Sequence, residues 1–353
     1  MSLLETTLQQ IEPQDVASRA AARARMEQLT MPHWALGRLM DLAEDLAGIT
    51  RSIRPAVARK AIVVMAGDHG VAASGVSLYP QEVTVQMIHN FVNGGAGCNA
   101  LARQVGAQVV VVDAGVAGDL CALVEAGKVI SKRVAPGTAN MQTGPAMSRE
   151  QAIASIEAGI EIALSLDASV DLFGTGEMGI GNTTPSSAIV AVLTGCEVEE
   201  ITGRGTGIDD TRLQNKIAVI KEALRVNNPD PSDALDVLAK VGGFEIGAIA
   251  GLILGAAALK KPVVVDGFIT TAGALIAQGL SPVSAEYMIA AHRSVEPGHC
   301  AAQKRLCKQP LLDLSLRLGE GTGAALAMNL VEASARILTE VATFAEASVS
   351  TAH

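Results

Sequence analysis

Aromatic residues are scarce in this sequence, and no hydrophobic run is long enough to cross a membrane. Phe, Trp and Tyr together make up 2% of the 353 residues, although apolar residues as a whole make up 49%. We therefore expect a core of closely packed aliphatic side chains. The longest apolar run, GAIAGLILGAAAL from Gly247, has 13 residues, whereas a membrane span needs about 20. We interpret this run as a buried helix.

Several protein classes are excluded by what the sequence does not contain. A net charge of −9 argues against a surface that binds nucleic acid or an anionic membrane. The five cysteines are an odd number without a C-x-x-C pair, so we expect reduced thiols and no metal site. The N-terminal segment MSLLETTLQQIEPQD lacks the basic region and the apolar core of a signal peptide. Together these features predict a soluble, cytoplasmic protein.

From Ala61 onward, short β-branched runs alternate with longer amphipathic or alanine-rich stretches. This alternation is typical of an α/β fold with a mainly parallel sheet flanked by helices. We predict six strands with the sequences AIVVMA, QVVVVD, VDLF, EEITG, PVVVD and YMIAA. Glycine, acidic residues or histidine lie at their carboxyl ends, and ligands of open α/β sheets bind outside those ends. We therefore expect the active site at this edge of the sheet.

The segment GTGEMG, from Gly174 to Gly179, follows one predicted strand and matches the G-x-G-x-x-G fingerprint of dinucleotide-binding proteins. Two features argue against a dinucleotide site. Glu177 lies inside the glycine turn, where a pyrophosphate would have to pass, and Asn182-Thr-Thr-Pro185 delays the helix. The sequence contains neither the P-loop motif G-x-x-x-x-G-K-[ST] nor the nucleophile motif G-x-S-x-G.

A second glycine segment, GRGTG from Gly203 to Gly207, precedes a predicted helix that contains Lys216. Two glycine loops and one lysine can hold a phosphate through backbone N–H groups and one positive charge. For Lys216 alone, an exposed position on the helix is the simpler interpretation. His69 and His292 end two predicted strands without the spacing of metal ligands, so we interpret them as hydrogen-bonded structural residues.

Near the C-terminus, the segment LRLGEGTG places Glu320 among small residues, just before an alanine-rich helix. Glycine next to a carboxylate permits a tight turn or the close approach of a ligand. A simpler interpretation is a helix start with an acidic residue near the N-terminal end of the helix dipole.

Eight segments occur in an order that is specific to one family. They are GDHGV, GPAMSREQA, FGTGEMGIGNTTP, NKIAVIKEAL, DVLAKVGGFEIGAIAGLILGAA, PVVVDGF, HRSVEPG and LRLGEGTGAALAM. Together they strongly resemble the nicotinate-nucleotide–dimethylbenzimidazole phosphoribosyltransferase family of the cobalamin lower-ligand pathway. The resemblance implies a Rossmann-like α/β domain, a small helical domain built from both chain ends, and a homodimer. We place the large domain at residues 31–302 and the small domain at residues 1–30 with 303–353.

The resemblance also implies a reaction. Ribose 5-phosphate passes from nicotinate mononucleotide to a nitrogen of 5,6-dimethylbenzimidazole or a related base, giving α-ribazole 5′-phosphate and nicotinate. No cofactor or metal is implied. Two alternatives stay open at this point, namely a dinucleotide-dependent oxidoreductase and a non-catalytic subunit that needs a partner chain.

Matched to this sequence position by position, the site residues of the family fall into three groups. The general base is Glu320 and the second active-site acid is Glu177; the phosphate and ribose are bound by Gly176, Gly203, Gly205, Lys216 and Ser294; the base pocket contains Tyr79, Met87 and Leu318. A carboxylate in a partly apolar pocket has a raised pKa and can accept the benzimidazole proton. We expect the glycines around this carboxylate to make room for a flat aromatic base. Tyr79 and Met87 are bulkier than the corresponding residues of the best-known members, so a benzimidazole, a purine and a phenol all stay open as the accepted base.

Overall fold

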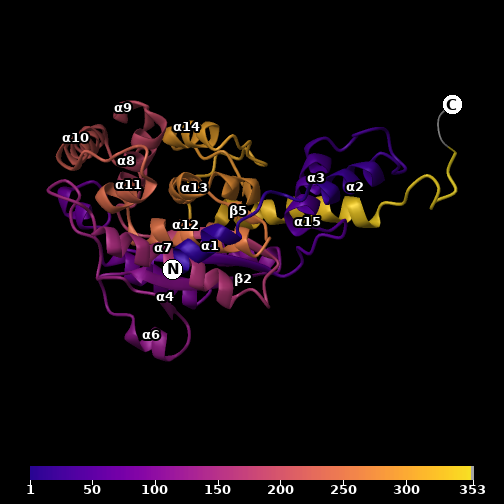
Figure 1. Ribbon diagram of the computed structural model, residues 1–353. Coiled ribbons are helices and arrows are strands. Elements are labelled where there is room, and N and C mark those ends of the chain that lie inside the picture. Colours follow the sequence, from indigo (N-terminus) through magenta and orange to yellow (C-terminus); the bar gives the residue numbers. More distant parts are fainter. Residues whose placement is uncertain (351–353) are drawn as a thin grey trace.

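The computed structural model describes residues 1–350, which form an α/β body with a helical extension at one end (Figure 1). The strands are β1 (Lys60–Gly67), β2 (Ala107–Gly115), β3 (Ile130–Ser131), β4 (Leu172–Met178), β5 (Val263–Val265) and β6 (Met288–Ala290). The helices before β4 are α1 (Leu3–Gln10), α2 (Val16–Met26), α3 (Arg38–Thr50), η1 (Gly70–Ser74), α4 (Val83–Val92), α5 (Gly97–Gln104), α6 (Cys121–Glu125) and α7 (Arg149–Ser165). Those after β4 are α8 (Thr183–Thr194), α9 (Val198–Ile201), α10 (Asp210–Asn227), α11 (Ala234–Val241), α12 (Phe244–Ala258), α13 (Phe268–Leu280), η2 (Pro282–Tyr287), α14 (Pro297–Arg305) and α15 (Thr322–Glu340).

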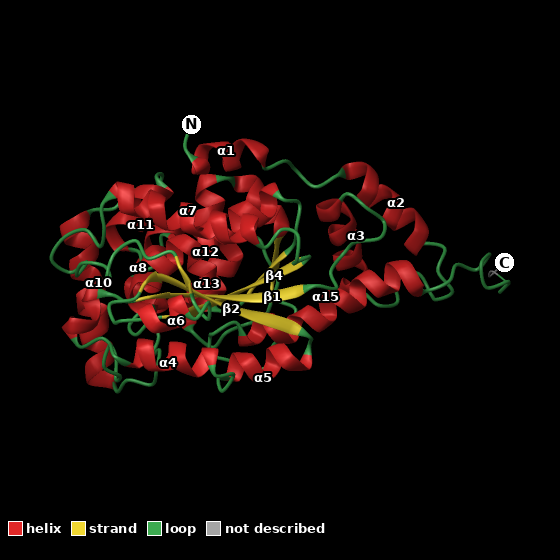
Figure 2. Cartoon of the chain, turned by 90° about the horizontal axis from the view of Figure 1, so that it is seen from below, coloured by secondary structure: helices red, strands yellow, loops and turns green. Residues whose placement is uncertain are grey.

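Within residues 1–350 the strands form one parallel sheet in the order β3-β2-β1-β4-β5-β6. This is the strand order of doubly wound dinucleotide-binding folds. In these folds, successive strands are added toward one edge of the sheet up to β3 and toward the other edge from β4 onward. Figure 2 shows the sheet between two layers of helices. Ala61, Val63 and Met65 of β1 belong to the hydrophobic cluster under α7 and α12, whereas Ile62 and Val64 belong to the cluster that includes α15. Both faces of β1 are therefore buried, as the parallel fold requires.

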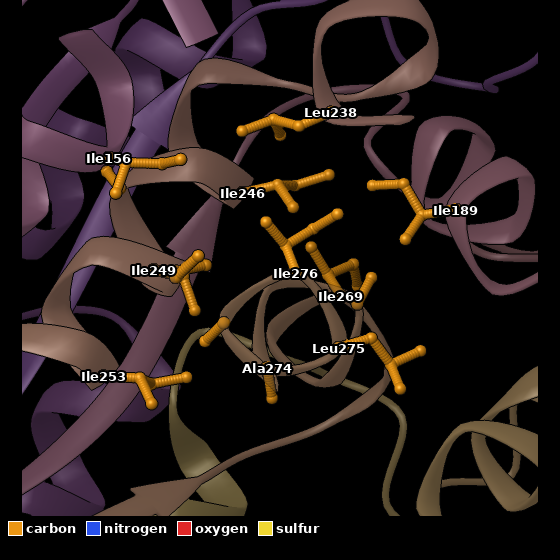
Figure 3. Close-up of a cluster of buried hydrophobic side chains, with 14 of the residues drawn as sticks. Ile156, Ile189, Leu238, Ile246, Ile249, Ile253, Ile269, Ala274, Leu275 and Ile276 are labelled. Carbon is orange, nitrogen blue, oxygen red and sulfur yellow. The ribbon is translucent and has the colours of Figure 1, made fainter. Parts of the chain in front are cut away.

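The core is aliphatic, as the composition predicts. Figure 3 shows isoleucine, leucine and alanine side chains of α7, α8, α11, α12 and α13 packed against one another. The predicted buried helix is confirmed, because α12 contains the run that begins at Gly247 and its residues from Phe244 to Ala257 are buried. Its glycines allow close contact with α7. A Cβ atom at Gly251 would lie 1.8 Å from the carbonyl oxygen of Ile156.

The helical extension contains α2, α3 and the C-terminal part of α15 (Figure 1). Its own small hydrophobic cluster joins Met26, Met40, Ala43 and Leu338. The first helix, α1, instead packs against α7 and α12 of the α/β body. The domain boundaries near residues 31 and 302 stay a prediction.

Five of the six predicted strands are confirmed, and the prediction of a strand at EEITG is wrong. Glu199, Glu200 and Ile201 of that segment belong to the short helix α9, whose C-cap is Thr202. The two glutamates occupy the first turn and complement the helix dipole. The strand β3 was not predicted, because its two residues are too few to produce a pattern. The alanine-rich helix predicted after Glu320 is confirmed as α15, which ends at Glu340. Among residues 1–350, no helix is both long and apolar enough to span a bilayer.

Candidate active site

A cavity of about 510 Å³ opens at the carboxyl ends of β4, β5 and β6, where the sheet topology places a ligand. Its lining combines two kinds of residue. The apolar ones are Tyr79, Val83, Met87, Met178, Ile180, Phe268, Ile269 and Leu318; the polar ones include Glu177, Asn182, Thr183, Thr206, Asp266, Thr270, His292, Ser294, Glu296, Arg317 and Glu320. Such a cavity suits a ligand with a flat apolar part and a strongly polar part.

Glu177 and Glu320 meet in this cavity. Oε1 of Glu177 accepts a hydrogen bond from the backbone N–H of Glu320 at 3.1 Å, and Oε2 accepts one from the Asn182 side chain. Burial raises the pKa of Glu177 to about 7, and the neighbouring charges of Asp266 and Glu320 add to this effect against the two hydrogen bonds. Glu177 therefore exchanges a proton near neutral pH.

The Glu320 side chain is anchored at the start of α5. Its Oε2 accepts a hydrogen bond from the backbone N–H of Cys98 at 3.4 Å. Burial raises the pKa of Glu320, and the Cys98 hydrogen bond opposes this shift. A carboxylate in this state can accept a proton from a bound ligand more readily than an exposed glutamate can.

The backbone of Glu320 adopts a left-handed conformation that is rare for a residue with a side chain. Its φ is 63°, and the flanking Gly319 and Gly321 have φ values of 78° and 90°. A non-glycine residue in this region costs about 1–3 kcal/mol, so surrounding contacts must hold it in place. Such strain is typical of functional sites.

The glycines around Glu320 allow its turn to pack closely against neighbouring side chains. A Cβ at Gly319 would lie 2.2 Å from Oε1 of Glu177, and one at Gly323 would lie 2.0 Å from Cδ2 of His292. At Gly321 it would lie 2.5 Å from Cγ2 of Ile62. The space that a side chain would take at each position is therefore filled by protein atoms, whereas Gly319 also lines the cavity. That these glycines make room for an aromatic base stays a prediction.

Lys216 lies behind the cavity wall rather than in it. This side chain is only 1% exposed, and its Nζ donates to Oγ1 of Thr183 at 2.7 Å and to the carbonyl oxygen of Gly203 at 3.2 Å. Burial lowers the pKa of Lys216 to about 8, against the opposing charge of Glu296. The ammonium group thus links the start of α8 to the second glycine segment, and the interpretation of Lys216 as an exposed helix residue is wrong.

Most of the residues that the family resemblance selects come together in this cavity. Those that line it are Glu177, Glu320, Gly205, Ser294, Tyr79, Met87 and Leu318. Gly203 and Lys216 lie behind the lining, and Gly176 lies within β4, where a Cβ would be 2.7 Å from the carbonyl oxygen of Glu320. Gly176 therefore permits the close approach of the Glu320 turn to the strand.

Several residues that line the cavity were not among the predicted site residues. Asp266 directly follows β5 and His292 lies two residues after β6, positions at the carboxyl edge of the sheet that could have revealed them. His292 had been interpreted as structural. Glu296 and Arg317 lie in the segments HRSVEPG and LRLGEGTGAALAM that carry the family resemblance, but neither had been assigned a role. The described part of the chain, residues 1–350, has no group of three or more His, Cys, Asp or Glu side chains placed to hold a metal ion.

The geometry of GTGEMG differs from that of a dinucleotide fingerprint. Its first five residues belong to β4, which continues to Met178, and α8 begins only at Thr183. In a dinucleotide site, the glycines form the turn between strand and helix. Here Glu177 instead points its carboxylate at the Glu320 turn.

The comparisons with known proteins agree with this geometry. A family model described as "Phosphoribosyltransferase" matches residues 11–349. The chain belongs to this phosphoribosyltransferase family. It is 64% identical over 350 residues to a protein of Syntrophotalea carbinolica and 61% identical over 351 residues to one of Desulfotalea psychrophila, with 99% of each chain covered. Both relatives are named nicotinate-nucleotide–dimethylbenzimidazole phosphoribosyltransferase.

A crystal structure with the same fold comes from Thermus thermophilus. It is a nicotinate-nucleotide–dimethylbenzimidazole phosphoribosyltransferase that is 44% identical to this chain, with a TM-score of 0.90. The match covers 96% of this chain and 100% of the other. The predicted family and the predicted α/β fold are thereby confirmed.

His69 and Glu245 form a buried ion pair in this phosphoribosyltransferase. Nε2 of His69 is 2.7 Å from Oε1 of Glu245, and both side chains are buried. Burial opposes the protonation of His69, but Glu245, with help from Asp68 and Glu177, raises its pKa above the ordinary imidazole value. The prediction that His69 is hydrogen-bonded is confirmed, and its structural role stays a prediction.

We predict that the protein is less stable at alkaline pH, because the stabilising contribution of this ion pair is lost there. Because the pKa of His69 is raised in the folded state, the contribution is complete below the pKa of a free imidazole and is lost as the pH rises through the folded value. The melting temperature should therefore fall as the pH rises from below the ordinary imidazole pKa, about 6.5, into the alkaline range. A His69→Gln variant should show a smaller fall, and an equal fall in both proteins would assign the effect to other groups.

Proposed function

We propose that this protein transfers the ribose 5-phosphate of nicotinate mononucleotide to a nitrogen of 5,6-dimethylbenzimidazole. The products are α-ribazole 5′-phosphate and nicotinate, and the reaction belongs to the assembly of the cobalamin nucleotide loop. The observation that carries the proposal is the buried pair of Glu177 and Glu320 in a cavity with both apolar and polar walls. The names of the relatives point to the same reaction.

Glu320 is the general base of this proposal. One benzimidazole nitrogen attacks C1′ of the ribose, the proton on the other nitrogen passes to the Glu320 carboxylate, and the bond from C1′ to the pyridinium nitrogen breaks. The bonding pair returns to the pyridine ring, which leaves as nicotinate without its positive ring charge. The raised pKa of Glu320 supports this role, because general bases work best when their pKa lies near the working pH. Glu177 accepts a hydrogen bond from the backbone N–H of Glu320 and thereby holds this turn in place.

The phosphate and ribose are assigned to the polar wall. Thr183 stands at the first position of α8, and helix N-termini bind phosphate through their free N–H groups. Gly205 and Ser294 line the same cavity, and the buried Lys216 supplies a positive charge behind Thr183. Arg317 also lines the cavity and brings a second cation to it. Fixed geometry of this kind contributes to catalysis by orienting the ribose for in-line attack.

The flat base is assigned to the apolar wall. Tyr79, Val83, Met87 and Leu318 offer hydrocarbon and aromatic surface but few hydrogen-bonding groups. Such a wall favours a methylated benzimidazole over a purine, whose polar edge would lose water without gaining partners. We therefore expect dimethylbenzimidazole to be preferred over adenine.

The assembly and the compartment belong to the same proposal. By family resemblance we infer a homodimer that works in the cytoplasm. Light scattering of the purified protein should then give about twice the mass of one chain.

A transfer assay with the purified chain tests the proposed function. Nicotinate mononucleotide and dimethylbenzimidazole are supplied together and separately, with adenine and a phenol as competing bases, and products are identified by chromatography and mass. We expect equal amounts of nicotinate and ribotide, formed only when both substrates are present. Nicotinate release without a base would indicate a nucleotide hydrolase. No product with any base would indicate a subunit that needs a partner chain.

A further inference from the structure

Asp266 contacts the same backbone turn that carries Glu320. It follows β5 and is only 1% exposed. Its Oδ2 accepts a hydrogen bond from the backbone N–H of Gly321 at 3.1 Å, and its Oδ1 accepts one from that of Ala324 at 2.9 Å. Both carboxylate oxygens of Asp266 are thus engaged by residues directly after Glu320.

These contacts replace a cap that α15 lacks in its own sequence. The residue at its N-cap position is Gly321, which has no side chain, and the N–H of Ala324 is the group that an N-cap side chain would normally bind. Asp266 supplies this acceptor from a different strand. The left-handed turn at Glu320 is therefore held on both sides, by Glu177 through the N–H of Glu320 and by Asp266 through the next residue.

Asp266 is itself fixed in place. Its backbone N–H donates to Oγ1 of Thr175 at 3.1 Å, and Nε2 of His292 lies 3.7 Å from its Oδ1. A Cβ at Gly323 would come within 2.8 Å of the same oxygen, so the glycine there leaves room for this carboxylate. The contacts leave little freedom for the carboxylate to rotate.

We propose that Asp266 is a positioning residue for the reaction, which holds the strained turn so that the Glu320 carboxylate faces the bound base. The proposal rests on the proposed function of Glu320. It assigns Asp266 an action through Glu320, without a bond to the substrate. Misplacing a reacting group by about 1 Å can cost about 100-fold in rate, so loss of this support should affect turnover more than binding.

The variant Asp266→Asn tests this role. An amide has one accepting oxygen, so either Gly321 or Ala324 must face an NH2 group instead of an acceptor. We expect kcat to fall by about 10–100-fold, while KM for nicotinate mononucleotide changes by less than about 3-fold. The double variant with Glu320→Gln should be no slower than Glu320→Gln alone, because both changes disable the same base.

A matched control is available at the end of β2. Asp113 is 2% exposed and accepts a hydrogen bond from the backbone N–H of Val116 at 2.8 Å, but it does not line the cavity within the described residues. Asp113→Asn should therefore leave kcat unchanged even if it lowers the melting temperature. A merely structural role for Asp266 would make the two variants behave alike.

Three results would overturn the proposal. They are a kcat of Asp266→Asn within about 3-fold of the wild type, a raised KM with unchanged kcat, and additive losses in the double variant. If Asp266→Asn does not fold, Thr175→Val removes the acceptor of the Asp266 backbone N–H, together with the long 3.5 Å hydrogen bond from Thr175 to the carbonyl oxygen of Val264. In that variant kcat should fall about 3–10-fold at unchanged KM. An unchanged kcat in that variant would also contradict the proposal. An inactive wild-type enzyme would instead refute the proposed function.

Discussion

Replacing Glu320 with glutamine is expected to lower kcat by about 10²–10⁴-fold, the usual contribution of a general base. The amide cannot accept the benzimidazole proton, whereas its oxygen can still accept the hydrogen bond from the N–H of Cys98. The fold and the binding of nicotinate mononucleotide should therefore be preserved. Single-turnover measurement of ribotide formation, together with calorimetric binding of the nucleotide, separates the two effects.

A matched control for this variant lies on the helix that follows Glu320. Glu340 is exposed at the end of α15 and pairs only with Arg336 among its described neighbours. Glu340→Gln should retain wild-type turnover, since exposed ion pairs contribute little. A kcat of Glu320→Gln within about 3-fold of this control would remove Glu320 from the role of base.

The second large effect concerns stability. We expect Gly251→Ala to lower the free energy of unfolding by about 3 kcal/mol or more, at the upper end of the range for overpacked cores. The added methyl group would lie 1.8 Å from the carbonyl oxygen of Ile156, and both partners in this clash are parts of a helix backbone. Neither can rotate away, so α7 and α12 must separate along their contact and lose the packing between them.

Urea denaturation of Gly251→Ala and of Gly144→Ala measures this effect. A Cβ at Gly144 would have no atom within 4 Å, so its change in stability should be near zero or slightly favourable. Equal midpoints for the two variants would show that α7 and α12 do not pack as closely as described.

The local sequence pattern was sufficient to predict those helices and strands that are long or fully buried. The strand β1 and the helix α12 could be predicted because burial on all sides leaves an uninterrupted apolar run. Short elements gave no such signal. The segment EEITG carries two β-branched residues and a glycine like a strand end, yet Glu199 and Glu200 stabilise a single helical turn there.

The contacts that build the site join distant parts of the chain, and no periodic pattern of the sequence predicts them. Glu177 and Glu320 are 143 positions apart, and Asp266 and Gly321 are 55 positions apart. The family resemblance selected the two glutamates but not Asp266, and it did not identify the protein atoms against which the glycines near Glu320 pack. Only the folded structure shows that the glycines near Glu320 make room for Glu177, His292 and Ile62.

The most direct test of a single displacement assisted by Glu320 is the configuration at C1′ of the ribotide. Nuclear magnetic resonance of the product from β-nicotinate mononucleotide measures it. Direct attack by the base inverts this carbon and predicts the α-ribotide. A β-ribotide would mean two successive inversions through a bond from C1′ to an enzyme carboxylate, and would contradict the role of Glu320 as a base.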